Sequence, residues 1–223
     1  MSIEAVVFDF DGVIIDTETP DFTTWQQEFR AHGVELSREL WSGYIGGGVG
    51  AFDIYSHLAE LTGSDLDRDE VGPRRRGRYL DAVNANPLLP GVIDYLSAAR
   101  RLGLRVAIAS NSSRDWVEGH VAHRGLGGYI EAIRTPDDVG AVKPAPDVYL
   151  AALDAVGVPP KRAVAVEDSP TGAAAAVAAG LFCVAVPNGM TENMEFARCD
   201  LRLGSLVEMA LPDLLALASS RVG

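Results

Sequence analysis

The chain of 223 residues is long enough for one large domain, or for a core domain that carries a smaller insert. Its formal net charge of -12 argues against a nucleic-acid-binding protein, which would present a basic face. Two cysteines are too few for a disulfide framework, so we expect a reduced, cytoplasmic setting. The uncharged stretch 169–191 is interrupted by proline and glycine and its apolar part is too short to cross a bilayer, so we expect no membrane partner.

The apolar run 5–8 predicts a strand that is buried on both faces of a parallel sheet. Asp9 and Asp11 follow it, and because side chains alternate along an extended chain, we expect both carboxylates to lean the same way. Two like charges at the end of a buried strand are costly without a cation between them. The pattern therefore favours a metal-assisted reaction at the carboxyl edge of a sheet over an ordinary acidic loop.

Residues 17–86 have a different character, with apolar residues at helical spacing and no convincing strand. The arginines at 74, 75, 76 and 78 are expected to form a solvated helix face. The turn residues 84–87 predict a return hinge. We therefore expect residues 17–86 to form an all-helical cap, inserted into an α/β core made of residues 1–16 and 87–223. Cap helices are predicted over about 22–33, 51–61 and 69–83, with the loose loop 46–50 before the second.

From Leu89 onward, predicted helices and strands alternate, which is typical of a doubly wound parallel sheet. Ser112 or Ser113 is expected to cap one of these helices. Strands are predicted at 105–109, 129–133, 163–166, 181–186 and about 201–203, and helices at about 90–103, 113–121, 147–156, 173–179 and 212–219.

Polar side chains follow three of the predicted core strands. In open parallel sheets ligands bind at the carboxyl edge, so residues that lie far apart in sequence can meet there. Carboxylates from two strands would make a hard oxygen site suited to Mg²⁺, and a hydroxyl and an ammonium beside it suit a phosphoryl group. The residues are Asp9 and Asp11, Ser110 and Asn111, and Glu167 and Asp168, with Lys143 from a fourth element.

Four motifs in this order closely resemble those of the haloacid dehalogenase superfamily, in its phosphatase and β-phosphoglucomutase-like branch with a helical cap. The resemblance spans almost the whole chain. It implies a Rossmann-like α/β core and phosphoryl-transfer chemistry. The motifs are Asp9-Phe10-Asp11-Gly12-Val13, Ser110-Asn111, Lys143-Pro144 and Glu167-Asp168-Ser169.

The resemblance also implies a role for each motif residue. Asp9 would attack phosphorus and form an aspartyl phosphate, and Asp11 would protonate the leaving group and then activate water. Ser110, Asn111 and Lys143 would bind the transferring phosphoryl group.

The same resemblance implies a bound Mg²⁺ ion. Asp168, a carboxylate oxygen of Asp9 and the backbone carbonyl of Asp11 would be its ligands. Glu167 would not bind the ion directly but would support its ligands or reach it through a water molecule.

Differences from the motifs of other branches of this superfamily narrow the range of expected reactions. Asp11 argues against a dehalogenase, in which halide needs no proton, and the absence of lysine between residues 17 and 84 argues against a Schiff-base phosphonate hydrolase. β-Phosphoglucomutases resemble the chain but hold a second phosphate with cationic residues where this chain has Gly46, Gly47 and Gly48, the expected specificity loop. We therefore expect a Mg²⁺-dependent phosphatase of a small phosphorylated metabolite, sugar phosphates first, with a mutase as the alternative.

A rival from another class is a phospho-accepting receiver or binding module, which also uses a doubly wound sheet, aspartates and a lysine. The position of the aspartates on the first strand and the helical insert after it argue against this alternative. The expected partner is a small phosphorylated substrate, and no pattern in the sequence indicates an oligomeric state.

Overall fold

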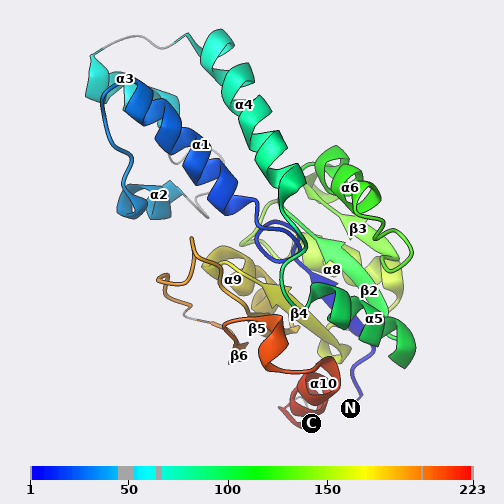
Figure 1. The fold of residues 1–223 in the computed structure, drawn as a ribbon. Coiled ribbons are helices and arrows are strands. Elements are labelled where there is room, and N and C mark those ends of the chain that lie inside the picture. The colour runs from blue at the N-terminus through cyan, green and yellow to red at the C-terminus, as the bar shows by residue number, and fades with distance from the viewer. Residues whose placement is uncertain (1, 45–52, 64–66, 197, 222–223) are drawn as a thin grey trace.

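The computed structural model describes residues 2–44, 53–63, 67–196 and 198–221. At its centre lies a parallel sheet with the strand order β3-β2-β1-β4-β5-β6 (Figure 1). This confirms the predicted doubly wound α/β core. The strands are β1 (Ala5–Phe8), β2 (Arg105–Ala109), β3 (Ala132–Arg134), β4 (Ala163–Glu167), β5 (Phe182–Ala185) and β6 (Leu201–Arg202).

Helices cover both faces of the sheet. Every residue of β1 is therefore buried, and its side chains alternate between two apolar clusters. Val6 and Phe8 pack in the cluster that includes α5, α6 and α10. Ala5 and Val7 pack in the cluster that includes α8 and α9. The helices are α5 (Val92–Leu102), α6 (Arg114–His123), α8 (Asp147–Val156), α9 (Pro170–Ala179) and α10 (Leu211–Arg221).

The structure differs from the sequence prediction at the start of β3 and in several short helices. β3 begins at Ala132 rather than at Tyr129, whose N–H instead donates to the Leu126 carbonyl in a turn. A short helix, α7 (Pro136–Val139), was not predicted; it begins with a capping box between Thr135 and Asp138. Short 3₁₀ turns occupy Pro160–Arg162 and Leu206–Glu208.

The expected serine cap of α6 is wrong. Ser113 occupies the N-cap position but makes no side-chain capping bond. Asp137 accepts the hydrogen bond from the Arg114 N–H instead, at 2.8 Å. The Ser112 hydroxyl is engaged at the candidate active site.

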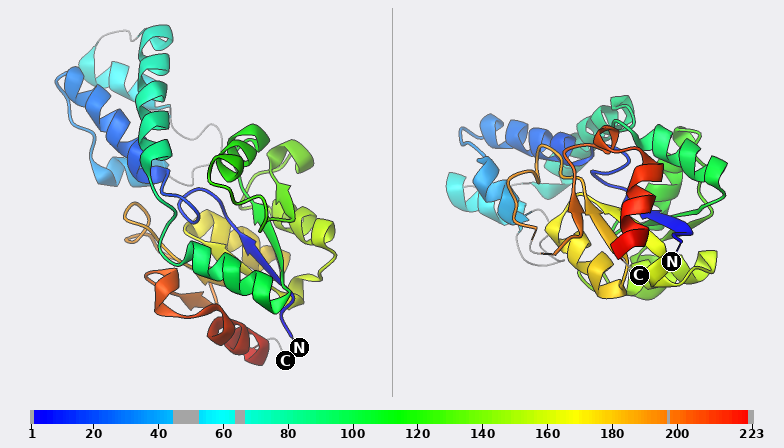
Figure 2. Two further views of the ribbon diagram at one scale, coloured as in Figure 1. Left: turned by 45° about the vertical axis from the view of Figure 1, so that its right-hand side comes forward. Right: turned by 90° about the horizontal axis from the view of Figure 1, so that it is seen from below.

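Between β1 and α5, the described residues form four helices in a layer beyond the carboxyl edge of the sheet (Figures 1 and 2). The first three share an apolar cluster, in which Trp41 is buried. Met190, from the loop after β5, joins the cluster and anchors the cap to the core. The helices are α1 (Glu18–Ala31), α2 (Arg38–Tyr44), α3 (Ile54–Thr62) and α4 (Arg68–Ala85), of which α2 was not predicted.

The return hinge is shorter than predicted, because α4 continues through Asn84 and Ala85. Asn86 is extended, as expected for a residue before proline. Its side-chain amide donates to the Asp16 carbonyl at 2.8 Å, so the two connections between core and cap touch. The residue boundaries 1–16, 17–86 and 87–223 remain a prediction.

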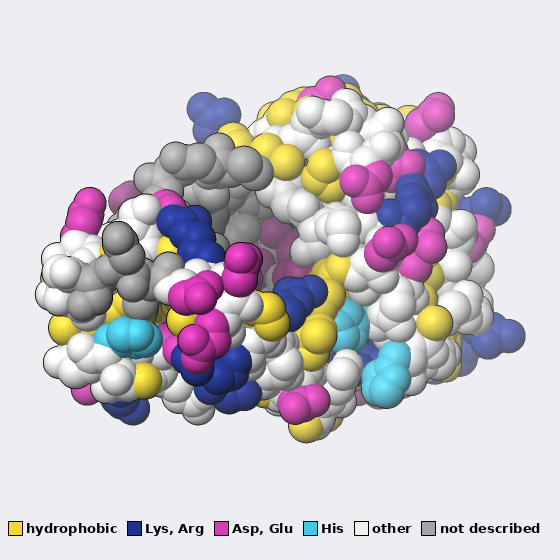
Figure 3. Space-filling model, turned by 90° about the horizontal axis from the view of Figure 1, so that it is seen from above, with side chains coloured by type: hydrophobic (Ala, Val, Ile, Leu, Met, Phe, Trp, Pro, Cys, Tyr) yellow, Lys and Arg dark blue, Asp and Glu magenta, His cyan; other side chains and the backbone are white. Residues whose placement is uncertain are grey.

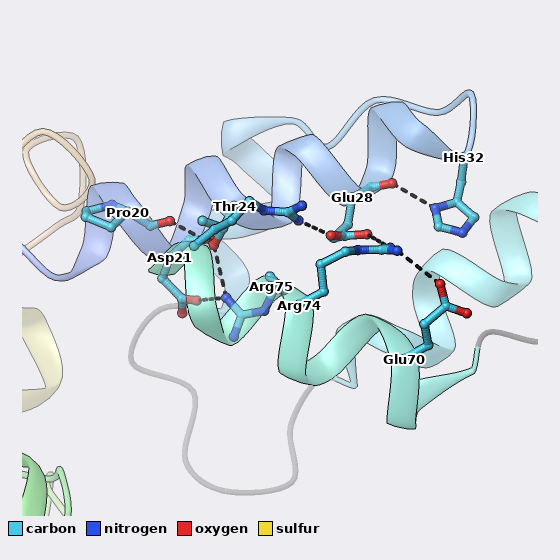
Figure 4. Close-up of polar contacts among 9 residues, drawn as sticks. Pro20, Asp21, Thr24, Glu28, His32, Glu70, Arg74 and Arg75 are labelled. Atoms are coloured by element: carbon cyan, nitrogen blue, oxygen red, sulfur yellow. Dashed lines mark hydrogen bonds and ion pairs between the residues drawn. The ribbon is translucent and has the colours of Figure 1, made fainter. Parts of the chain in front are cut away.

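The arginine cluster of α4 is not simply a solvated face. The buried carboxylate of Glu28 on α1 accepts from Arg74 at 2.9 Å and also from Arg78. Arg75 donates to Asp21 at 2.5 Å and to Thr24 at 3.1 Å (Figure 4). Arg74 and Arg76 are exposed, as expected, but the partners on α1 were not predicted because they lie about 50 residues away, beyond the reach of any local pattern.

No helix among the residues that the structure describes is both long enough and apolar enough to cross a membrane.

Candidate active site

The carboxyl ends of β1, β2 and β4 meet at one edge of the sheet. Phe8 at the end of β1 is in register with Ile108 of β2 and Val166 of β4. The residues that follow these strands, Asp9 and Ser110 among them, therefore lie side by side, as expected for a parallel sheet.

A buried ammonium group lies at the centre of this edge. Lys143 Nζ donates to Asp9 Oδ1 at 2.7 Å and to Glu167 Oε1 at 2.6 Å. The Tyr149 hydroxyl donates to the same Glu167 oxygen at 2.5 Å. Asn111 Oδ1 accepts from the Lys143 backbone N–H at 2.8 Å, so Asn111 positions the lysine. These contacts fix the Asp9 carboxylate in one orientation.

Burial and neighbouring charges set the protonation states of Asp9 and Lys143. Burial raises the pKa of the Asp9 carboxyl, while the adjacent Lys143 ammonium acts in the opposite direction. Burial would lower the pKa of Lys143, but Asp9 and Glu167 raise it above its ordinary value. The lysine therefore stays charged at neutral pH.

Asp168 completes a cluster of three acids. Oxygen atoms of Asp9, Glu167 and Asp168 lie within 4.8 Å of one another. Burial raises the pKa of Asp168 well above its ordinary value, and the charges of Asp9 and Glu167 add to this shift. One ammonium cannot neutralise three carboxylates, so the donor set fits a divalent cation with oxygen ligands.

Three packing details around the cluster support this interpretation. Glu167 Oε2 is buried and has no hydrogen-bond partner among the described residues. Asn188 Nδ2 donates to Asp168 Oδ2 at 2.7 Å. Gly12, with φ of 75°, leaves room for Asp168, because a Cβ there would lie 2.2 Å from Asp168 Oδ2.

Asp11 has a different environment from Asp9. Its Oδ1 accepts from Trp116 Nε1 at 2.9 Å, and its Oδ2 accepts from the Ser112 hydroxyl at 2.6 Å. Its carboxylate is not part of the three-acid cluster. Asp9 and Asp11 nevertheless line one cavity, in agreement with the expectation that they lean the same way.

Trp116 links this carboxylate to the cap, a connection that sequence reasoning missed. Its ring stacks on Tyr79 of α4 with centroids 5.7 Å apart and an interplanar angle of 14°. The Arg76 guanidinium lies over both rings. The helical pattern around Trp116 was visible, but nothing in it indicated a partner on another domain.

A cavity of about 280 Å³ lies between cap and core. The core supplies Asp9, Asp11, Ser110, Asn111, Lys143 and Asp168, whereas Gly46, Gly47 and Gly48 lie outside the described residues. Figure 3 shows this hollow, with acidic side chains in its depth.

The cap wall of the cavity was not predicted from the sequence. Glu18 and Asp21 from the first turns of α1 line it, together with Tyr79 of α4 and Thr17. Burial raises the pKa of Glu18 to about 8, and Asp11 and Asp21 contribute to the shift. The available signal was the position of two acids one turn apart, directly after the strand that carries Asp9.

Comparisons with known proteins show the family of this chain. The family model of the haloacid dehalogenase-like hydrolases matches residues 3–180. The chain is 42% identical to YhcW of Bacillus subtilis, with 96% of each chain covered. It is 32% identical to hexitol phosphatase B of Escherichia coli, covering 96% of this chain and 97% of the relative.

A solved structure is similar over nearly the same length. A CbbY mutant from Rhodobacter sphaeroides in complex with xylulose-(1,5)bisphosphate has a TM-score of 0.73 and 31% identity, covering 95% of this chain and 99% of that one. The chain therefore belongs to the haloacid dehalogenase-like hydrolase family, as an enzyme of its phosphatase branch with a helical cap.

Proposed function

We propose that the protein is a Mg²⁺-dependent phosphatase that hydrolyses a small phosphorylated metabolite through an aspartyl-phosphate intermediate. The observation that carries this proposal is the buried contact of Lys143 Nζ with both Asp9 and Glu167, beside Asp168. Such an arrangement holds one carboxylate in a fixed position while leaving negative charge that a divalent cation and a phosphoryl group can share.

Asp9 is the nucleophile. One of its carboxylate oxygens forms a bond to phosphorus as the bond between phosphorus and the ester oxygen breaks. Asp11 donates a proton to the departing oxygen and then takes a proton from the water that attacks the phosphoenzyme. Water forms the new bond to phosphorus, the bond to Asp9 breaks, and inorganic phosphate and free Asp9 are released.

The phosphoryl group is bound by neighbouring residues of the core. Ser110 lines the cavity; its hydroxyl oxygen accepts from the Ser112 N–H at 3.0 Å, and the hydroxyl donates to Asp11 Oδ2 at 3.4 Å, a long contact that a phosphoryl oxygen would replace. Lys143 carries the positive charge, and Asn111 holds its backbone.

Mg²⁺ would be held by the carboxylates of Asp9 and Asp168 and by the backbone carbonyl of Asp11, and when bound it neutralises charge on the transferring group. Glu167 supports this set through Lys143 and Tyr149, from which its Oε1 accepts, while its unpartnered Oε2 would reach the ion through a water molecule.

A phosphorylated sugar is the substrate class that the relatives support. Hexitol phosphatase B is named for a sugar-alcohol phosphate, and the CbbY structure holds a ketose bisphosphate. The cavity of about 280 Å³ suits a ligand of that size. The free thiols Cys183 and Cys199 are consistent with a reducing, cytoplasmic setting.

The cap of residues 17–86 would open and close about its two connections near Asp16 and Asn86, admitting substrate and excluding water from the first step. Equal hinge mobility with and without a phosphate analogue would contradict this motion.

A phosphate-release screen over phosphorylated metabolites, run with Mg²⁺ and with a chelator, tests the proposal. We expect turnover of at least one sugar phosphate that requires Mg²⁺ and disappears in Asp9→Asn. Folding of the variant is checked by thermal melting. Metal-independent turnover, or full activity in the variant, would contradict the proposed mechanism.

A further inference from the structure

The cavity of the proposed active site has very few positive charges. Among the described residues that line it, Lys143 is the single lysine or arginine, and its ammonium already contacts Asp9 and Glu167. The segments outside the description add no cationic side chain, because 45–52 and 64–66 contain neither lysine nor arginine. No side-chain cation in the cavity is therefore left to bind a second anionic group of a substrate.

The arginines nearest the cap wall are engaged with other groups. Arg75 donates to Asp21 and lies over the Trp25 ring. Arg76 lies over the rings of Tyr79 and Trp116. These guanidinium groups lie behind the wall or beside it, since neither arginine lines the cavity.

The cap wall presents carboxyl and hydroxyl groups. Glu18 and Asp21 line the cavity from α1, together with Thr17 and Tyr79. The Thr17 hydroxyl oxygen is buried and has no hydrogen-bond partner among the described residues. A wall of carboxyl and hydroxyl groups is suited to a ligand that carries hydroxyl groups.

The wall disfavours negative charge. Burial and the charges of Asp11 and Asp21 raise the pKa of Glu18 to about 8, so this carboxyl is largely protonated at neutral pH. A second anion on a substrate would meet the same opposition. A hydroxyl or ammonium group would instead donate hydrogen bonds to the wall.

We propose that this cavity selects phosphate monoesters whose leaving group carries no further anionic group, and that Asp21 of the cap supports this selection by neutralising Arg75. Uncharged polyols and amine-bearing sugars fit the wall, whereas bisphosphates and phosphorylated sugar acids do not. The inference rests on the proposed phosphatase function and narrows its substrate class. It sets this chain apart from the CbbY structure, which holds a bisphosphate.

A matched substrate series tests the inference. Glucose 6-phosphate, glucosamine 6-phosphate and 6-phosphogluconate share the same primary ester, but the rest of the leaving group is neutral, cationic and anionic respectively. Fructose 6-phosphate and fructose 1,6-bisphosphate form a second pair. We expect kcat/KM to be about tenfold or more lower for the anionic member of each set, and at least as high for the amine as for the neutral sugar.

The outcomes separate the two proposals. Turnover of neutral and anionic esters at similar kcat/KM would overturn the selection while leaving the phosphatase function intact. No Mg²⁺-dependent turnover of any ester in the series or in the wider screen would overturn both.

Variants of the cap acids test whether Asp21 is responsible. Asp21→Asn leaves Arg75 without its counter-charge and should raise the ratio of kcat/KM for 6-phosphogluconate to that for glucose 6-phosphate several-fold. Glu18→Gln replaces a largely protonated carboxyl and should change this ratio little. Asp81→Asn, the same substitution as Asp21→Asn at an exposed position of α4, should leave the ratio unchanged. Thermal melting identifies variants that fold. An unchanged ratio in folded Asp21→Asn would overturn the role given to Asp21.

Discussion

The acids at the edge of the sheet and those in the cap differ in how many cationic partners they have. At the sheet edge, three buried carboxylates share the one ammonium of Lys143. In the cap, Glu28 is matched by two arginines and Asp21 by one. Acids that are compensated in this way stabilise a fold, whereas acids left in excess keep charge available for a ligand. The comparison teaches that the uncompensated cluster, rather than acidity itself, marks the reactive region.

The largest effect is expected from Lys143→Met, which removes the only ammonium in the core cluster. Asp9 and Glu167 would then be buried without a counter-charge, so we expect a stability loss of about 3–5 kcal/mol. Turnover should fall by more than about 10³-fold, because transition-state charge is no longer balanced. Urea denaturation and phosphate release measure the two effects.

Lys161→Met is the matched control, since Lys161 is the other lysine of the chain and is exposed. We expect wild-type stability and activity. If Lys143→Met resembled this control, the role given to the buried ammonium would be wrong.

Two glycine-to-alanine substitutions sharpen the comparison between the regions. A Cβ at Gly172 of α9 would lie 1.9 Å from Glu167 Oε2, so Gly172→Ala should cost about 2–3 kcal/mol through overpacking. A Cβ at Gly77 of α4 would meet nothing within 4 Å, so Gly77→Ala should stabilise the protein by about 0.5–1 kcal/mol. Denaturant unfolding of both variants checks the signs, and a tolerated Gly172→Ala would show that the cluster is not tightly packed.

Trp116→Phe tests the contact between cap and core. It removes the N–H that donates to Asp11 while retaining a ring to stack on Tyr79. We expect kcat to fall about tenfold to a hundredfold with little change in KM, the size expected for a lost hydrogen bond to a charged group.

Trp25→Phe provides the control, because Trp25 lies in the cap cluster and packs on Tyr55. A similar fall in kcat in both variants would indicate a general loss of cap packing and contradict the positioning of Asp11 by Trp116.

The smallest effect is expected in the cap, from Glu28→Gln. Burial opposes ionisation of Glu28, but hydrogen bonds from Arg74 and Arg78 prevail and hold its pKa below the ordinary value of 4.5. The stabilisation from a carboxylate with a lowered pKa is present above its ordinary pKa and is lost as pH falls through the lowered value.

The substitution should therefore cost about 1–2 kcal/mol at neutral pH, and the difference from wild type should shrink below about pH 4. Urea denaturation across this pH range measures it. A difference that grows on acidification would show that the ion pairs do not stabilise the cap.

Much of the core was predictable because its signals are local. The runs that form β1, β2 and β4 are apolar enough to be buried on both faces, and parallel pairing then requires their polar ends to meet. The cluster of Asp9, Glu167 and Asp168 follows from that geometry.

The contacts that could not be predicted join segments that are distant in the sequence. Nothing near Trp116 indicates that its N–H reaches Asp11, and nothing near Arg75 indicates Asp21 as its partner. Side-chain partners across a domain boundary are set by tertiary packing, which no local spacing encodes.

The central claim is that Asp9 carries the phosphoryl group for part of each turnover. Rapid acid quenching of the enzyme during turnover of its best sugar phosphate, followed by peptide mass spectrometry, tests it most directly. The account predicts that the peptide containing Asp9 gains the mass of one phosphoryl group, and that this species is absent from Asp9→Asn. A phosphoryl group found on another residue at this time point would contradict the account.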